Sequence, residues 1–167
     1  MKVSNIHCRT LPITLESAGP LIDSLASKQD LLRPTENWPA MRFDRPLAVG
    51  ATGGHGAIRY FVNEYEPGRC LGCTFTSPKG FDGTHSFRLD SVSESDCKLT
   101  HTIDMDTTGL ASVLWLLMIR PLHDALVEDA LFLAERFAGV ENPSKTPWSP
   151  WVFVLRALWR RVFPRTK

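Results

Sequence analysis

The feature that most constrains the fold of this chain is a change of hydrophobic period at Gly109. Much of the sequence before this glycine alternates apolar and polar residues between glycine and proline turns, which is typical of antiparallel strands. Residues 110–138 instead carry apolar side chains three and four positions apart, which predicts one long helix. Pro121 lies inside this helix and predicts a kink. We therefore expect a meander of strands followed by one long kinked helix.

The segments before the meander predict one more strand and short helices. Residues 3–13 alternate as a strand does, a short helix follows near residues 17–25, and a helical turn is expected at 28–32. A glycine-rich hairpin at residues 50–56 then opens the meander. The whole pattern gives about six strands in an α+β arrangement. The first strand divides its residues between two faces, with Ile6 and Cys8 on one and Asn5 and His7 on the other.

Size and charge exclude several classes of protein. The 167 residues suffice for one domain of ordinary size. The 19 basic and 18 acidic residues nearly balance, so nucleic acid is not an expected partner. The first ten residues lack the apolar run of a signal peptide, and the apolar stretch 109–119 is shorter than the about 20 residues that span a bilayer. We expect a cytoplasmic protein.

The four cysteines are expected to be reduced thiols in that compartment. Cys70 and Cys73 form the motif CLGC, which invites comparison with a zinc site. The segment is a predicted strand, however, and strand residues three apart point to opposite faces. Because a shared ion would need a bulge here, the sequence predicts no metal and no cofactor.

The hairpin at residues 83–105, GTHSFRLDSVSESDCKLTHTIDM, places a histidine on the apolar face of each strand. With Leu89 paired to Leu99, His85 and His101 become diagonal neighbours roughly 7 Å apart. A buried imidazole without a partner costs about 1–3 kcal/mol, so each ring needs one. Burial also lowers the pKa of a histidine, which makes both rings neutral donors and acceptors near pH 7.

Three roles fit this pair of histidines. They could be structural groups bonded within a filled core, cavity groups that bind the polar end of a ligand, or acid–base catalysts. Cavity lining is the interpretation that we favour, and no catalytic residue is assigned.

Charged residues gather on the long helix just after the predicted kink. Adjacent helix residues diverge by about 100°, so His123 and Asp124 are not expected to hold one ion jointly without help. Arg120 and Asp124 are spaced for a surface ion pair. The acids Asp124, Glu128 and Asp129 are expected to form a solvated face.

The order of these elements resembles the START-like or polyketide cyclase/dehydrase superfamily, often called SRPBCC. The resemblance covers residues 3–138 and rests on three stretches, GGHGAIRYFVNEYEPGRCLGCTF, THSFRLD…CKLTHTIDM and WLLMIRPLHDALVEDAL. It implies the helix-grip (START/Bet v 1-like) fold, in which a curved antiparallel sheet wraps around the long helix and encloses an elongated apolar cavity. Members carry lipids, sterols or hormones, or cyclise polyketides, so the fold does not select a function.

The function expected first is binding or transport of a hydrophobic or amphipathic small molecule in that cavity. His85 and His101 would hold its polar end, and His55 at the tip of the glycine-rich hairpin would gate access. The expected cavity walls are Phe87, Ile103, Met105, Trp115 and Met118. Trp38 is expected first as a core residue and second as part of the cavity wall. A cyclase or dehydratase that uses the cavity histidines, and a module that docks on membranes, are the alternatives.

The C-terminal part is expected to be separate from the ligand-binding domain at residues 1–140. Residues 141–150 form a proline-rich linker, and an amphipathic helix rich in aromatic and basic residues follows to 167. This helix could pack on its own domain, contact a membrane or a second copy of the chain, or remain disordered. The expected apolar stripe is Trp151, Leu155, Leu158 and Val162, and Arg156 and Arg160 are expected on the far side.

Overall fold

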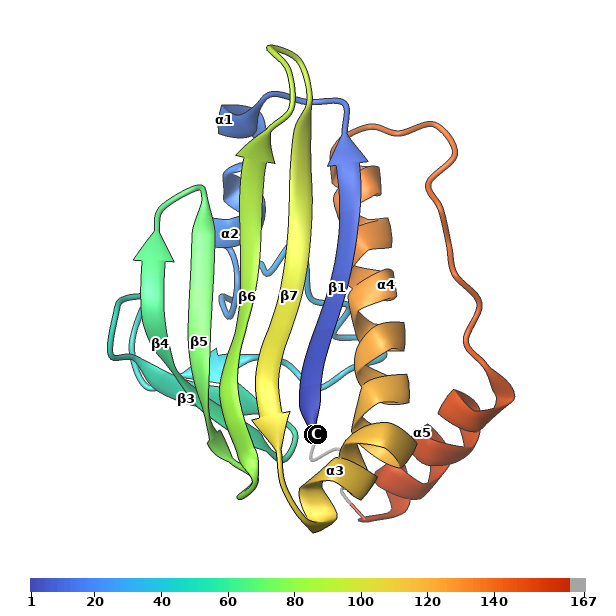
Figure 1. Ribbon diagram of the computed structural model, residues 1–167. Helices are drawn as coiled ribbons and strands as arrows, with labels where there is room; N and C mark the ends of the chain where they lie inside the picture. Colours follow the sequence, from blue (N-terminus) through green and yellow to red (C-terminus); the bar gives the residue numbers. More distant parts are fainter. Residues whose placement is uncertain (163–167) are drawn as a thin grey trace.

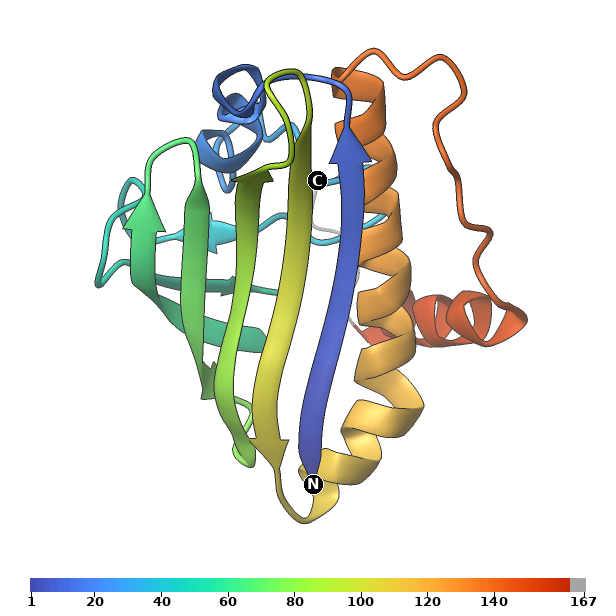
Figure 2. The same cartoon turned by 45° about the horizontal axis from the view of Figure 1, so that its top comes forward.

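The computed structural model describes the backbone of residues 1–162 and the side chains of residues 1–158. Seven antiparallel strands form one sheet in the order β1-β7-β6-β5-β4-β3-β2. The sheet curls so that its β2–β3 end turns across behind its middle (Figures 1 and 2). The strands are β1 (Lys2–Leu11), β2 (Arg42–Phe43), β3 (Thr52–His55), β4 (Ile58–Glu66), β5 (Cys70–Ser77), β6 (Phe81–Ser91) and β7 (Cys97–Thr107).

The expected α+β architecture with a long closing helix is confirmed, and the strand beyond the expected six or so is the two-residue β2. Helices α1 (Leu15–Ala18) and α2 (Pro20–Asp23) follow β1, as predicted. The helical turn predicted at residues 28–32 is wrong, because this segment forms turns ahead of Pro34. The carboxylate of Asp30 accepts hydrogen bonds from the backbone N–H groups of Ala26, Leu32 and Arg33, and such local bonds compete with helix formation.

The long helix consists of three parts. They are α3 (Leu110–Leu114), the π-helical turn η1 (Trp115–Ile119) and α4 (Arg120–Phe137). Pro121 has no N–H to donate to the carbonyl of Leu117 four residues earlier. That carbonyl accepts a hydrogen bond from the indole Nε1 of Trp151 at 2.7 Å. The irregularity predicted near Pro121 is therefore a π-helical turn, and it supplies an anchor for the C-terminal helix.

The inner face of the sheet carries a large apolar cluster that α4 covers. Val127, Leu131 and Ala134 of α4 belong to the same buried cluster as residues of α2 and of the strands. Both views show α4 running alongside β1 (Figures 1 and 2). On β1 the face toward the helix carries Asn5 and His7, while Ile6 on the other face is 61% exposed. The contact between β1 and α4 is therefore partly polar.

The C-terminal helix α5 (Pro150–Val162) packs back on the domain. For the described residues this is the first of the three alternatives that the sequence left open. Trp148 meets Trp38 edge to face, with ring centroids 5.5 Å apart. The guanidinium of Arg156 lies 4.4 Å from the centroid of Trp38 and 4.0 Å from that of Trp148. It also donates to the carbonyl of Asn37 at 2.6 Å.

The predicted stripe of α5 is wrong in part, because the helix turns a different face inward. Val152, Leu155 and Arg156 are buried, whereas Trp151 and Leu158 are about half exposed. The two tryptophan rings that flank Arg156 stabilise its charge next to the domain, which the periodicity of apolar residues does not reveal. The side chains of Trp159, Arg160, Arg161 and Val162, and all of Arg165, lie outside the described residues.

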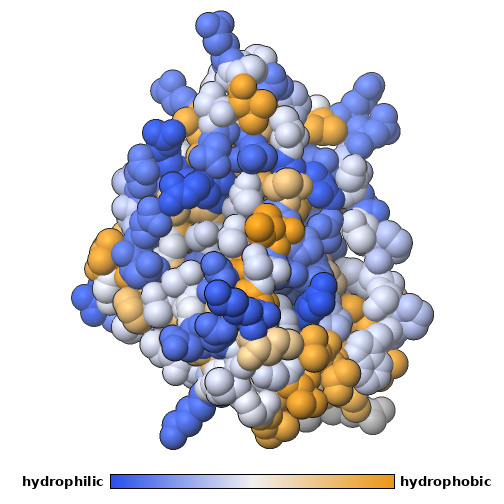
Figure 3. All heavy atoms as spheres, in the orientation of Figure 1, coloured by the Kyte–Doolittle hydropathy of each residue, from blue (hydrophilic) through white to orange (hydrophobic). Residues whose placement is uncertain are grey.

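An apolar patch remains at the end of the molecule where α3 and α5 meet. Figure 3 shows apolar side chains gathered at this end, at the lower right. The helical segment Leu110–Phe137 is long and apolar enough to cross a membrane by length and composition alone, although α4 covers the sheet with one side. Contact with a membrane or a second copy through this end stays a prediction. The patch residues are 47–72% exposed: Leu110, Val113, Leu116, Leu117, Trp151, Val154 and Leu158.

We predict that Arg156→Ala lowers the free energy of unfolding by about 2–3 kcal/mol, because it removes two cation–π contacts and a buried hydrogen bond. Arg156→Lys should recover only part of this loss, since lysine lacks the planar group that stacks between two indoles. Urea unfolding at pH 7 measures both variants. Arg69→Ala, which removes an exposed ion pair with Glu66, is the control and should change stability by less than about 1 kcal/mol. Equal effects of the alanine variants would contradict the prediction.

Candidate functional site

A pocket of about 340 Å³ lies between the inner face of the sheet, the long helix and the segment that leads to β2. Its wall is almost entirely apolar, and polar groups enter it at only a few points in the described part of the chain. A concave apolar wall with a few convergent polar groups is the usual form of a small-molecule site. Wall residues from the sheet are Phe75, Phe81, Phe87 and Ile103; from the helix, Trp115, Met118, Leu122 and Leu126; from the segment before β2, Leu32, Trp38 and Met41.

The predicted hairpin register is confirmed, since Leu89 pairs with Leu99 and His101 with Phe87. The structure brings seven of the eight predicted site residues to the pocket wall: His55, His85, Phe87, His101, Ile103, Trp115 and Met118. Met105 does not line the pocket. It lies opposite Gly83 near the end of β7, and it is buried with Val3 and Trp115 in a separate cluster.

The five histidines of the chain, four on the sheet and His123 on α4, lie in one row, which we call the histidine row. Nδ1 of His55 lies 3.0 Å from the hydroxyl of Tyr60, and the Tyr60 ring meets His85 at 4.6 Å between centroids. The further centroid separations are 6.0 Å from His85 to His101, 4.9 Å from His101 to His123 and 6.1 Å from His123 to His7. The row thus joins four strands to α4.

The sequence predicted only part of this row. Tyr60 sits between His55 and His85. Its strand carries aromatic residues on both faces, so the alternation of residues does not indicate whether Tyr60 points inward. His7 and His123 join the row because β1 pairs with β7 and α4 crosses beside them. The one available signal was that His7 shares a strand face with Asn5, which is unusual for a face that meets a helix.

Burial makes the inner part of the row neutral. Burial lowers the pKa of His55, His101 and His123 below the usual value, and it lowers that of His85 to about 3. Three ring nitrogens have no hydrogen-bond partner in the described part of the chain: Nε2 of His85, Nδ1 of His101 and Nε2 of His123. Unpaired buried polar atoms cost about 1–3 kcal/mol each, so these nitrogens are suited to a ligand or to water.

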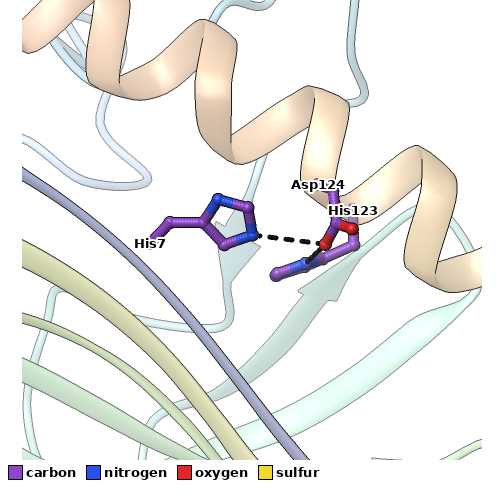
Figure 4. Close-up of side chains that lie close together, drawn as sticks. All are labelled: His7, His123 and Asp124. Carbon is purple, nitrogen blue, oxygen red and sulfur yellow. Dashed lines mark hydrogen bonds and ion pairs between the residues drawn. The ribbon is translucent and has the colours of Figure 1, made fainter. Parts of the chain in front are cut away.

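The outer end of the row is acidic. Nε2 of His7 lies 3.3 Å from Oδ1 of Asp124, and its Nδ1 lies 2.8 Å from Oε1 of Glu128. Nδ1 of His123 lies 3.4 Å from the same Asp124 oxygen. Figure 4 shows both rings turned toward Asp124. The hydrogen bond to Asp124, and after it that to Glu128, raises the pKa of His7 despite burial.

The prediction of a solvated acidic face on the long helix is therefore wrong for most of its members. Asp129 is buried and accepts hydrogen bonds from the indoles of Trp38 at 2.7 Å and Trp148 at 3.1 Å. Glu128 is half-buried against β1. The helix loses its expected solvent face because β1 lies along one side and the C-terminal segment folds over another. The predicted Arg120–Asp124 ion pair is present at 3.6 Å.

His123 and Asp124 were not expected to hold one ion jointly without help, and the structure places a third group of ligand type, His7, beside them. Ligand atoms of His7, His123 and Asp124 all lie within 4.8 Å of one another, which would suit a metal ion. The divergence of about 100° separates two adjacent residues of one helix and does not include groups from other elements. The third group comes from β1, and long side chains on neighbouring helix positions can turn toward it.

Comparison with known proteins supports the fold. No protein-family model matches this sequence, and no curated protein sequence matches it. Among solved structures, CalU16 from Micromonospora echinospora is 13% identical, with a TM-score of 0.57 over 97% of this chain and 86% of that one. Norcoclaurine synthase from Thalictrum flavum, in complex with a transition-state analogue, is 9% identical, with a TM-score of 0.60 over 85% and 99%.

The third similar structure is the di-domain aromatase/cyclase StfQ of the steffimycin biosynthetic pathway. It is 14% identical, with a TM-score of 0.60 over 83% of this chain and 51% of that one. These similarities show the fold alone. The chain has a Bet v 1/SRPBCC-type helix-grip fold, which confirms the architecture that the sequence resemblance implied.

We predict that the free energy of unfolding falls as the pH drops from 6.5 to 5. Unfolded histidines take up protons near pH 6.5, whereas the four buried rings have lowered pKa values and stay neutral, so acid favours unfolding. Each such histidine contributes a loss of up to about 1.4 kcal/mol per pH unit. Urea unfolding at several pH values measures this slope, and His85→Gln should make it shallower by about that amount.

His7 is predicted to act with the opposite sign. Its pKa is raised in the folded state, so its stabilisation is complete below about pH 6.5 and is lost as the pH rises through the folded pKa. His7→Gln should therefore leave the acid slope of the buried histidines in place and remove a stabilisation that is largest at low pH. A shallower acid slope in this variant would contradict the assignment.

Proposed function

We propose that the protein binds an elongated amphipathic small molecule in the pocket. Its apolar body would lie against the aromatic and aliphatic wall, and its polar end would meet His85 and His101. The observation that carries this proposal is the combination of an apolar pocket of about 340 Å³ with unpartnered nitrogens of neutral imidazoles on its wall. Small-molecule pockets of about 300–1,000 Å³ with a few placed polar groups have this composition.

Two further features support binding rather than a filled core. Met118 is 37% exposed and lines the pocket, so the wall reaches the surface on the side of the long helix. Gly56 and Ala57 at the tip of the β3–β4 hairpin also line it, next to His55. Glycine at positive φ makes this tip easy to deform, which suits a gate. A cytoplasmic location stays a prediction.

An enzyme of the cyclase or dehydratase type is the second candidate. Nδ1 of His101 and Nε2 of His85 have no partner in the described residues, and neutral imidazoles can take a proton from an activated carbon or return one. StfQ, which is named as a cyclase, and norcoclaurine synthase, which is named as a synthase, share this fold. Their similarity supports the candidate through the fold only.

Filling the pocket should abolish binding. Ala130 is buried on α4 and lines the pocket, so Ala130→Phe places an aromatic ring in the proposed ligand volume. We expect it to weaken the binding of dansyl-labelled undecanoic acid, followed by fluorescence, by tenfold or more. Ala157→Phe makes the same change at an exposed position of α5 and should leave binding unchanged. Equal binding in the two variants, with both folded by circular dichroism, would rule out the pocket as the site.

Replacing both histidines separates carrier from enzyme. In the double variant His85→Asn/His101→Asn, asparagine keeps hydrogen-bonding groups in the pocket but cannot transfer protons near pH 7. A carrier should lose affinity for the dansyl-labelled acid by a modest factor and show no turnover in either form. An enzyme should lose turnover of a linear poly-β-ketone, followed by mass spectrometry, while it still binds the fluorescent acid. Turnover that survives the double change would exclude these histidines as catalysts.

A further inference from the structure

The acidic end of the histidine row holds three side chains of metal-ligand type. One ring nitrogen each of His7 and His123 and a carboxylate oxygen of Asp124 lie within 4.8 Å of one another. They come from two elements, with His7 on β1 and the other two on α4 (Figure 4). All three side chains are at least two-thirds buried, so their positions are fixed by the packing of helix on strand.

The distances within this cluster lie at the long end of the hydrogen-bond range and are compatible with a bound ion. Charge-assisted N–H···O bonds are usually about 2.7–2.9 Å long, whereas the two imidazoles stand 3.3 and 3.4 Å from Oδ1 of Asp124. Zinc ligands lie about 2.0–2.1 Å from the ion in a tetrahedron, which places neighbouring ligand atoms about 3.3–3.4 Å apart. The two separations match the edges of such a tetrahedron.

Two of the three ligands, His7 and Asp124, are also held from behind by further side chains. Oε1 of Glu128 lies 2.8 Å from Nδ1 of His7, which leaves Nε2 of His7 to face Asp124. Arg9 donates to the other oxygen of Glu128 at 2.6 Å. Asn5 donates to Oδ1 of Asp124 at 3.0 Å and fixes the carboxylate. A carboxylate that orients a ligating histidine through its second nitrogen is a common arrangement around protein metal ions.

We propose that His7, His123 and Asp124 form a binding site for a divalent transition-metal ion of the zinc class at the edge of the pocket. Two imidazoles and one carboxylate suit zinc, cobalt, nickel or ferrous iron, and they leave coordination positions open for water or a ligand group. Calcium and magnesium prefer sites made of oxygen atoms and are not expected to bind tightly.

The proposed ion would connect the cluster to the pocket through His123. This residue lines the pocket, and its Nε2 has no partner among the described residues. With Nδ1 on a metal ion, Nε2 must carry the ring proton. The metal would thereby fix the tautomer of His123 and present an N–H donor to the pocket. The metal site does not depend on the proposed ligand binding, because its ligands and supports lie at the β1–α4 contact.

The test uses the full chain without an affinity tag, because histidine tags bind the same ions. Cys8 is exposed on β1, so the background carries Cys8→Ser to remove a competing thiol. After treatment with EDTA, the protein is titrated with Zn²⁺ by calorimetry and with Co²⁺ by visible absorption. We expect one ion per chain, d–d bands of a tetrahedral or five-coordinate Co²⁺ site, and a rise in Tm of roughly 5–10 °C at a hundredfold excess of Zn²⁺ over Kd.

Single substitutions assign the ligands. Glu128→Gln, which alters the support of His7, should weaken binding by about 10–100-fold. His7→Gln, His123→Gln and Asp124→Asn should each weaken it more and abolish the Co²⁺ bands. His55→Gln changes a histidine at the other end of the row and is the matched control, with metal binding unchanged. Circular dichroism confirms that each variant is folded.

Two outcomes would overturn the proposal. One is the absence of stoichiometric binding to the stripped protein, which would leave the cluster as a network of ion pairs. The other is binding that survives Asp124→Asn and His123→Gln, which would place the ion elsewhere. The fluorescent-acid assay on His7→Gln and Asp124→Asn, whose side chains do not line the pocket, keeps the two proposals distinct. Loss of metal binding with retained acid binding leaves the pocket proposal intact, and the reverse leaves the metal site intact.

Discussion

The structure depends on a contact that is polar where most contacts between a helix and a sheet are apolar. Along β1, His7 and Arg9 meet Asp124, Glu128 and Glu135 of the long helix. Removing one member of a buried ion pair typically costs about 3–5 kcal/mol, because the partner keeps its charge without compensation. This network holds α4 against the edge strand of the sheet. Apolar side chains between α4 and the middle of the sheet then need not fill all of the space there, which leaves room for the pocket.

The histidine row follows from the pairing of the strands. Neighbouring strands lie about 4.7–4.9 Å apart, and rings on paired positions of one face must stack at about that distance or diagonally beyond it. His85 and His101 stand diagonally because His101 pairs with Phe87 and His85 with Ile103. His7 pairs directly with His101, but its ring is drawn toward the acids of α4. The histidine row therefore crosses an apolar surface while the pairing of the strands stays regular.

The sequence predicted what depends on local pattern. Alternation and period gave the strands and the long helix, and Leu89 opposite Leu99 gave the hairpin register. Tertiary contacts decided the rest. The pairing of β1 with β7 joins residues about one hundred positions apart, so no local signal could bring His7 beside His123. Burial of Asp129 required Trp148 of the proline-rich linker, and the inward turn of Arg156 required two indoles to pack against it.

If the pocket binds a small molecule as proposed, the row would also determine what kind of molecule it accepts. A purely apolar ligand would cover the free nitrogens of His85, His101 and His123 without bonding to them. Each buried nitrogen left unpaired costs about 1–3 kcal/mol, which corresponds to roughly 5- to 150-fold in affinity. A ligand that carries a hydroxyl or carbonyl group at the correct depth avoids this loss and keeps the full apolar contact. Because neutral imidazoles both donate and accept, they can serve either group. If the pocket binds a ligand as proposed, the arrangement would favour amphiphiles that carry an oxygen group at the depth of the row over plain hydrocarbons.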